Sequence, residues 1–344
     1  MDSDNHVFTS HFFRGSSNFG PAMLNFPKLL SLLTAITICI SPGLRKAEAN
    51  EMGWPRTIVH AAGKFTLANR PLRIISTTPS VTGILLSMNA PVIATAATTP
   101  SGLTDQKGFF SQWAQVADER GVQVLYPNLN FDMEAVIGWD PDLVIASATG
   151  ADSILSHVAE LQAQGIPTLV VNYSNRSWQA LAIEIGRATG LEHQAEEAIR
   201  RFDTKVAQVA ATLAAPREPV SIVGYNISGS FSIGRPESPQ AKLLQSLGLT
   251  VAGLPETLKS QVSRSSDFDF ISRENLPLAI EGSHVFLLRG TSREVDAFLA
   301  DPLLGNATSV KMHQVYPLGP TSFRIDYYSG LQMIHLVADA LRAR

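Results

Sequence analysis

The sequence predicts an α/β protein of two Rossmann-like lobes with mainly parallel sheets, joined by a single long α-helix, with a ligand cleft between the lobes. Short β-branched runs alternate with helical patterns in two separate series, which is typical of βα units on a parallel sheet. Between the two series, residues 177–214 consist almost entirely of helix-forming residues. The length of 344 residues also favours two domains, because single hydrophobic cores stop growing beyond about 250–300 residues.

The N-terminal segment has the features of an export signal peptide. Residues 29–40, LLSLLTAITICI, form an apolar run directly after Lys28. This run is shorter than the roughly 20 residues that a membrane-spanning helix needs. Ala47-Glu48-Ala49 then has the small-x-small pattern of a secretory cleavage site. We therefore expect residues 1–49 to be removed and the mature chain to reside in an exported compartment.

The only cysteine of the chain, Cys39, lies in this segment. The mature chain is therefore expected to contain no thiol, which excludes a disulfide framework, a cysteine-rich zinc site and a four-cysteine iron–sulfur cluster. The region before the apolar run is long and contains Asp2 and Asp4. Such acidic residues are unusual there, so the initiator stays open between Met1 and Met23.

The first lobe is predicted to span residues 50–190. Helices are expected at residues 80–88 and 152–164, and proline or glycine stands where a helix gives way to a buried strand. The expected strands are residues 73–76, 92–95, 143–147 and 168–172.

A single helix is predicted to link the lobes over residues 191–215. Apolar side chains recur every three or four residues over 192–213, which gives one buried stripe and a charged opposite face. At 1.5 Å per residue this helix would be about 33 Å long, and Pro216 would end it. A stiff connection of this kind predicts a small closure of the lobes.

The second lobe is predicted to span residues 216–344. The glycine-rich segment 229–234 has no phosphate-loop spacing and is expected to be a loop. The expected strands are residues 220–225, 284–288 and 314–318. The expected helices are residues 239–247, 273–280, 293–299 and 327–342.

Charge and motifs exclude several function classes. The formal net charge of -3 leaves no overall positive field for nucleic acid or an anionic membrane surface. After residue 49 there is no GxxxxGKS/T, GxSxG or HExxH string, and no GxGxxG follows a predicted strand. The histidines are scattered without metal-ligand spacing. We therefore predict no catalytic residue, no metal site and no resident cofactor.

Cationic and aromatic residues recur where predicted strands end. In α/β sheets, ligands bind at the carboxyl ends of the parallel strands, so we expect these side chains to line the cleft. Each one alone is also compatible with a surface cation or a packed aromatic ring, and their recurrence at one end of the sheets is the informative feature. The candidates are Lys107, Arg176, Trp178, Tyr225, Phe231, Arg264, Arg289, Phe323, Arg324 and Tyr327.

Six segments resemble those of a known family. They resemble the periplasmic substrate-binding proteins that serve ABC importers of iron-siderophores, haem and vitamin B12, and are most similar to the ferric enterobactin-binding members. The resemblance implies a periplasmic carrier, not an enzyme, that delivers a ferric siderophore of the catecholate type to an importer in the inner membrane. We also expect a monomer. The segments are ISTTPSVTG, ATTP with DQKGFFSQW, PDLVIASATGADS, NYSNRSWQ, RPESPQAKLLQSLG and SFRIDYYSGLQM.

A ferric catecholate fits the candidate residues chemically. Catechol oxygens fill the coordination sphere of the iron, so the protein needs no metal ligand of its own. Instead it needs arginine or lysine for the negative charge and flat side chains for the catechol rings. Three positions depart from the ferric enterobactin-binding pattern: Lys107 stands near an expected arginine, Phe231 lies in a loop without tryptophan, and Arg289 replaces a small residue.

Two glutamates are candidates for contact with the importer. Glu134 and Glu274 each lie near the start of a predicted helix that precedes a buried strand. The resemblance implies that such a pair docks onto arginines of the membrane permease. The helix dipole alone also favours an acidic residue in a first turn, but the recurrence of this context in both lobes favours docking.

Two other functions stay open. A haem or vitamin B12 carrier on the same scaffold could use His313 or Tyr327 as an iron ligand. An exported α/β esterase acting on siderophores could use Ser228 or Ser230 as nucleophile and His313 as base. No residue spacing in the sequence supports the esterase.

Overall fold

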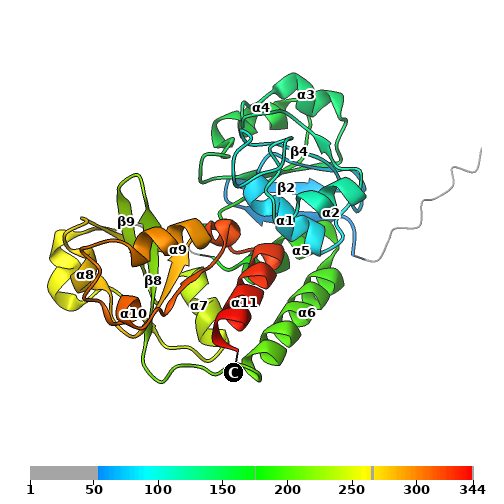
Figure 1. The fold of residues 1–344 in the computed structure, drawn as a ribbon. Helices are drawn as coiled ribbons and strands as arrows, with labels where there is room; N and C mark the ends of the chain where they lie inside the picture. The colour runs from blue at the N-terminus through cyan, green and yellow to red at the C-terminus, as the bar shows by residue number, and fades with distance from the viewer. Residues whose placement is uncertain (1–52, 175, 265–266, 343–344) are drawn as a thin grey trace, which may run out of the picture. The chain divides into compact units, whose positions relative to one another are not determined.

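The computed structural model describes residues 53–174, 176–264 and 267–342, without the side chains of residues 261, 263 and 264. These residues belong to one compact unit that contains two larger β-sheets (Figure 1). We call the part around the sheet of residues 74–171 the first lobe, and the part around the sheet of residues 220–317 the second lobe. The predicted signal peptide and both possible initiators lie outside the described residues.

In the described part of the chain, the first lobe is built on a five-stranded sheet whose strands are all parallel. The order β5-β4-β3-β6-β7 is that of a doubly wound sheet. β4 and β5 are added on one side of β3, and β6 and β7 are then added on the other side. All residues of β6, LVIAS, are buried, as expected for a strand covered on both faces. The strands are β3 (Ile74–Ser76), β4 (Val92–Thr95), β5 (Gln123–Val124), β6 (Leu143–Ser147) and β7 (Thr168–Val171).

The helices of the first lobe are short. The predicted helix 152–164 is a 3-10 turn at Leu155–His157 followed by an α-helix of six residues. An antiparallel hairpin of β1 (Arg56–His60) and β2 (Gly63–Leu67) was not predicted. It joins β7 through a hydrogen bond of 3.1 Å from the Ala61 N–H to the Val170 carbonyl. The helices are α1 (Pro79–Ser87), α2 (Ala114–Glu119), α3 (Met133–Gly138) and α4 (Val158–Ala163).

The sheet of the second lobe is mixed. β8, β10, β13 and β14 pair in parallel, whereas β9, β11 and β12 pair antiparallel. The prediction that residues 229–234 form a loop was wrong, because Ser230–Gly234 returns along β8 as the second strand of a hairpin. The strands are β8 (Val220–Asn226), β9 (Ser230–Gly234), β10 (Val251–Ala252), β11 (Ser263–Arg264), β12 (Phe268–Ile271), β13 (His284–Leu288) and β14 (Val315–Pro317).

Two helices, α5 (Trp178–Thr189) and α6 (Glu192–Ala210), lie in the chain between the two sheets. Gly190 separates them in a left-handed conformation, with a φ of 71°, which glycine adopts without a steric penalty. α6 has 19 residues and is therefore about 28 Å long. It ends before the predicted end of the linking helix at residue 215, because residues 211–212 form a turn and Leu213 bridges to Arg342. The domain boundaries at 190 and 215 stay a prediction.

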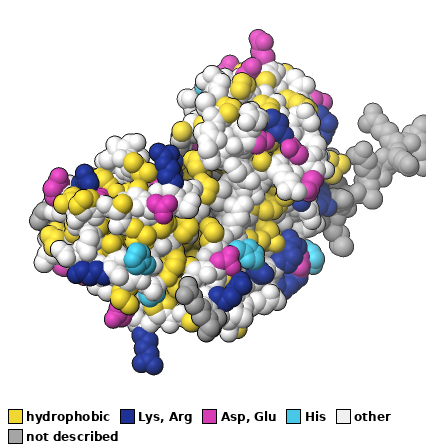
Figure 2. Space-filling model, in the orientation of Figure 1, with side chains coloured by type: hydrophobic (Ala, Val, Ile, Leu, Met, Phe, Trp, Pro, Cys, Tyr) yellow, Lys and Arg dark blue, Asp and Glu magenta, His cyan; other side chains and the backbone are white. Residues whose placement is uncertain are grey.

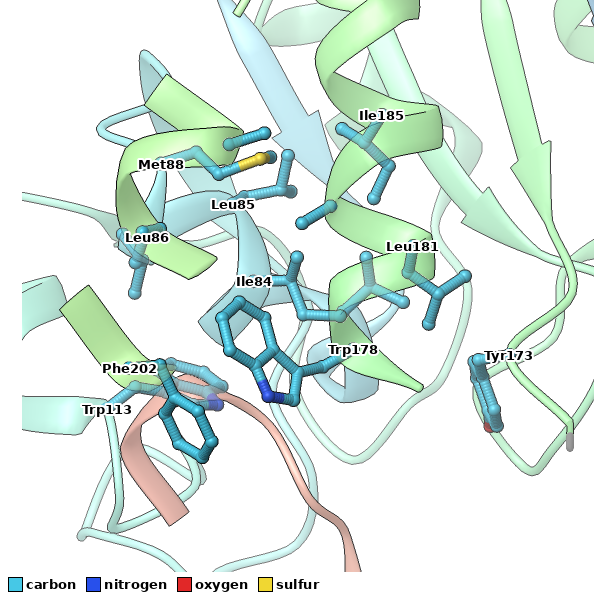
Figure 3. Packing of buried hydrophobic residues seen from close by; sticks show 14 of the residues in the cluster. Ile84, Leu85, Leu86, Met88, Trp113, Tyr173, Trp178, Leu181, Ile185 and Phe202 are labelled. Carbon is cyan, nitrogen blue, oxygen red and sulfur yellow. The ribbon is translucent and has the colours of Figure 1, made fainter. Parts of the chain in front are cut away.

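The buried side chains of α1, α5 and α6 share one hydrophobic cluster, in which Ile84, Trp178 and Phe202 lie close together (Figure 3). Met333 of the last helix belongs to the same cluster, so one core connects both lobes. Among the described helices, none has the length and apolar character to cross a membrane. The predicted helix 273–280 is shorter than expected, at Leu276–Ala279. The helices of the second lobe are α7 (Pro239–Ser246), α8 (Leu276–Ala279), α9 (Ser292–Leu299), α10 (Thr308–Lys311) and α11 (Tyr327–Leu341).

Candidate ligand-binding site

The loops that follow β3, β6 and β7 meet at one edge of the first sheet. Because the sheet order changes direction between β3 and β6, the crevice at their carboxyl ends is open to a ligand. Ser80 follows β3 and Tyr173 follows β7, and both line a small cavity. The second lobe contributes Phe323 and Arg324 to the same cavity, which we call the interlobe cavity.

Three larger cavities share lining residues with the interlobe cavity, and two of them carry the charged and aromatic side chains of the candidate site. The rim cavity has a volume of about 290 Å³ and shares Arg176, Pro239 and Asp267 with it. The sheet cavity has a volume of about 430 Å³ and shares Phe323 with it. We treat the interlobe, rim and sheet cavities together as the candidate site.

Arg324 lines the interlobe cavity together with Arg176. Its guanidinium carbon lies 4.2 Å from the centre of the Tyr173 ring, in a cation–π contact between the lobes. Its Nε atom is buried and has no hydrogen-bond partner in the described residues. The guanidinium is therefore held in place with donor capacity left over, as an anion-binding group requires.

The rim cavity gathers further positive charge. Arg176 pairs with Glu184 and donates to the Ala180 carbonyl at 3.3 Å. Arg235 and Lys242 were not predicted, although they lie in the segment RPESPQAK directly after β9. These three cations line the cavity together with the carboxylates of Glu237 and Asp267.

The amino ends of two helices also meet the rim cavity. The hydroxyl of Ser177 caps α5 by accepting a hydrogen bond from the Ala180 N–H, and the hydroxyl of Ser238 caps α7 in the same way. Ser177 and the first residue of α7, Pro239, line the cavity. The positive ends of two helix dipoles, one from each lobe, add to the attraction for an anion.

The sheet cavity combines aromatic and cationic walls. It contains three predicted residues, Tyr225, Arg289 and Phe323, and two aromatic residues that were not predicted, Phe268 and Phe270. Arg289 is exposed, and its backbone N–H donates to the Ser322 hydroxyl at 2.8 Å. This wall suits a ligand that has both aromatic rings and negative charge.

The family model of the periplasmic binding proteins matches residues 74–321. The chain belongs to this family. The match covers both lobes described above.

Individual relatives extend the match to most of the chain. The chain is 41% identical over 307 residues to the ferric enterobactin-binding periplasmic protein FepB of Escherichia coli O6:H1, covering 88% of this chain and 94% of that protein. It is 23% identical over 302 residues to the iron(3+)-hydroxamate-binding protein FhuD of Bacillus subtilis, covering 86% of this chain and 89% of that protein.

Solved structures of related proteins share the fold. The crystal structure of holo-ViuP matches with a TM-score of 0.75 and 38% identity, covering 84% of this chain and 96% of ViuP. Staphylococcus aureus SirA complexed with staphyloferrin B matches with a TM-score of 0.61 and 18% identity, covering 83% of this chain and 98% of SirA. At this lower identity the second match supports the fold alone.

In this periplasmic binding protein, Trp178 and Tyr327 were predicted to line the cleft but lie elsewhere. Trp178 is 2% exposed, and its ring contacts those of Phe202 and Tyr327 at centroid distances of 5.1 and 5.8 Å. Both residues begin helices, and the helical turn directs their rings toward α6. They line none of the three site cavities, although Trp178 lines a neighbouring cavity that shares Ser177, Pro239 and Lys242 with the rim cavity.

Strand alternation explains the position of Phe231. Ser230 and Ser232 face the sheet cavity, so Phe231 between them points to the opposite face. There its ring packs against that of Tyr225, at a centroid distance of 5.5 Å, and Phe231 is only 8% exposed. Tyr225 therefore borders the sheet cavity while its ring lies on the same opposite face as Phe231. The hydroxyl of Tyr225 donates to Asp301 at 2.9 Å, and burial raises its pKa to about 12.

Lys107 is held away from the cavities. It forms ion pairs with Asp118 and, at 3.8 Å, with Asp105, and its ammonium lies 4.9 Å from the centre of the Phe109 ring. The backbone of Arg264 lies in β11, but its side chain is outside the described part of the structure. Lys107 lines none of the three site cavities.

His313 and the serines of the esterase hypothesis lie at opposite edges of the second sheet. His313 precedes β14, and the strand register places Val315 at the level of Ser221, near the start of β8. Ser228 and Ser230 follow the other end of β8. At about 3.3 Å per residue, His313 is about 20 Å from them along the strands. It cannot act as their base.

The two candidate docking glutamates are exposed. Glu134 lies in the first turn of α3, which Asp132 caps. Glu274 lies in a turn before α8, where hydrogen bonds from its own backbone N–H and from the Ser272 hydroxyl lower its pKa. In the described residues there is no group of three or more His, Cys, Asp or Glu side chains that could hold a metal ion.

Proposed function

We propose that this protein captures a ferric siderophore of the catecholate type, similar to ferric enterobactin, and delivers it to an ABC importer. The observation that carries the proposal is Arg324, stacked on Tyr173 between the lobes with a buried, unpartnered Nε. The 41% identity to a ferric enterobactin-binding protein and the 38% identity to holo-ViuP support the same class of ligand.

The charge of the site fits such a ligand better than the charge of the whole molecule does. The formal net charge is -3, and basic and acidic side chains are interspersed on the face shown in Figure 2. Anion binding therefore depends on placed cations in a cavity with low-dielectric walls. Arg176, Arg235 and Arg324 supply charge there, while Phe268, Phe270 and Phe323 supply faces for catechol rings.

The protein acts as a carrier without catalysing a reaction, in this proposal. The iron arrives inside its chelator as cargo, so no resident cofactor and no protein metal ligand are needed. The position of His313 disfavours both the esterase and an iron-ligating histidine in the cleft. Tyr327, the other possible iron ligand of a haem carrier, packs against Trp178 and Phe202.

We further propose that the mature protein is a periplasmic monomer, released from the signal peptide of residues 1–49. Glu134 and Glu274 would dock onto arginines of the permease in the inner membrane. Each has an exposed apolar neighbour one helical turn later, Ile137 with 44% and Leu278 with 68% exposure. Light scattering of the purified mature chain tests the monomer, and mass spectrometry of the exported protein tests the cleavage site.

Ligand titration tests the function. Intrinsic tryptophan fluorescence of the mature protein is followed during addition of ferric catecholates, ferric hydroxamates, haem and cobalamin. We expect tight binding of a ferric catecholate alone. Tight binding of haem or cobalamin without any ferric siderophore would show that the assignment is wrong. Mass spectrometry of the recovered ligand separates a carrier from an esterase, because a carrier returns the siderophore intact.

A further inference from the structure

A buried carboxylate, Asp152, connects three loops at the carboxyl edge of the first sheet. Asp152 follows β6 and is 6% exposed. Its Oδ1 accepts a hydrogen bond of 2.6 Å from the Tyr173 hydroxyl, and its Oδ2 accepts one of 2.6 Å from the Thr78 hydroxyl. The Ser80 N–H, in the first turn of α1, donates to Oδ2 at 3.2 Å. The carboxylate is therefore held by donors that follow β3 and β7.

The bond to Asp152 fixes the ring of Tyr173. Burial, together with the charge of Asp152, raises the pKa of the Tyr173 hydroxyl to about 12, so the hydroxyl stays protonated and keeps donating at neutral pH. Gly150 provides the space for this contact, because a β-carbon there would lie 1.6 Å from the hydroxyl oxygen. The ring cannot turn without breaking a buried hydrogen bond.

Arg324 of the second lobe lies over the face of this fixed ring, at 4.2 Å from its centre. A guanidinium that stacks on a ring keeps the N–H groups in its own plane available as donors. The buried Nε has no partner among the described residues. The stack thus sets the direction in which Arg324 can donate into the interlobe cavity.

We propose that Asp152 and Tyr173 are positioning residues, which hold the Arg324 guanidinium in the orientation that binds an anionic group of the ligand. This inference rests on the proposed function. It identifies residues that control affinity although they are not among the arginines and lysines of the site. A guanidinium held before binding loses less conformational freedom when the ligand arrives. Its planar fork matches two adjacent anionic oxygens, as in one catecholate arm.

A double-mutant cycle tests the inference, with the dissociation constant for a ferric catecholate as the readout. Arg324→Ala is expected to weaken binding about tenfold or more, and Tyr173→Leu about fivefold, in line with a lost charged donor and a lost cation–π contact. The two changes together are expected to weaken binding no more than Arg324→Ala alone, because the ring acts only through the arginine. Both single variants should also show a weaker dependence of affinity on salt than the wild type.

Conservative variants separate positioning from folding. Tyr173→Phe keeps the ring but loses the bond to Asp152, and Asp152→Asn weakens the same bond. Each is expected to reduce affinity about two- to threefold, with no effect once Arg324 is alanine. Tyr316→Phe is the matched control, because it removes a hydrogen-bonded hydroxyl from a residue outside the three site cavities. Its affinity should equal that of the wild type.

The outcomes distinguish the two proposals. Additive losses in the cycle, or wild-type affinity of Tyr173→Leu, would overturn the positioning role while leaving the carrier function intact. If Tyr173→Leu does not fold, by circular dichroism, the cycle of Tyr173→Phe with Arg324→Ala decides the question in the same way. Failure of the wild type to bind any ferric catecholate would instead overturn the proposed function, and the positioning role with it.

Discussion

The carboxylate of Asp326 lies directly against the α-carbon of Gly83. A β-carbon on Gly83 would be only 2.5 Å from the Asp326 Oδ2 atom. Gly83 belongs to α1 of the first lobe, whereas Asp326 caps α11 of the second. Asp326 is 2% exposed, and the Gln112 amide donates to it at 3.4 Å. This close approach of two helices joins the lobes beneath the candidate site.

Gly83→Ala is expected to destabilise the protein by about 1–3 kcal/mol, because the added methyl group forces apart two packed helices. The free energy of unfolding in urea measures the effect. Gly138→Ala is the control, since Gly138 ends a helix and has no atom within 4 Å of an added β-carbon. Equal stability of the two variants would contradict the close contact.

Asp326→Asn is expected to change the pH dependence of stability. Burial raises the pKa of Asp326, in opposition to hydrogen bonds from Ser329, Gln112 and Tyr328. Because the unfolded chain then releases its proton more readily than the folded chain, the wild type loses stability relative to the variant as the pH rises above about 4. Asparagine preserves the helix cap. Urea unfolding of both proteins from pH 4 to 8 gives the difference, and a difference that grows in the opposite direction would argue against a raised pKa.

Arg289→Ala and Arg324→Ala are each expected to weaken ferric siderophore binding by about 1.5–3 kcal/mol, if each loses a charged hydrogen bond. Fluorescence titration provides the affinities. Arg342→Ala serves as control, because this arginine is exposed and pairs with Asp339 at 2.9 Å on α11. An unchanged affinity of either site variant would show that this arginine is a surface residue that does not contact the ligand.

Glu134→Ala and Glu274→Ala are expected to leave siderophore affinity unchanged and to reduce uptake into cells, since both carboxylates are exposed and neither lines the site cavities. Uptake of radioactive iron by cells that depend on this carrier measures the effect. Glu196→Ala, which removes an exposed glutamate from α6, should transport at the wild-type rate. Normal uptake by the Glu134→Ala, Glu274→Ala double variant would exclude docking through this pair.

Local patterns predicted most of the secondary structure. Buried strands such as β6 and β13 were predicted with their exact bounds, because their continuous apolar runs lie between turn residues. The hairpin of β8 and β9 was missed because small polar residues alternate with Phe231 and Ile233 between Gly229 and Gly234. Only pairing with Tyr225 and its neighbours makes that segment a strand.

The candidate site was also predictable from the sequence only in part. The sequence by itself determined the α/β class and the edge of each sheet to which Arg176, Arg289 and Arg324 belong, because strand direction and the helix that follows are local properties. Only the tertiary structure decided which side chains share a cavity. It placed Trp178 in the core with Tyr327 packed against it, held Lys107 beside Asp118, and brought Arg235 and Lys242 to the rim. The physical reason is that the direction of a side chain depends on helical phase, strand alternation and ion-pair partners that are distant in the chain.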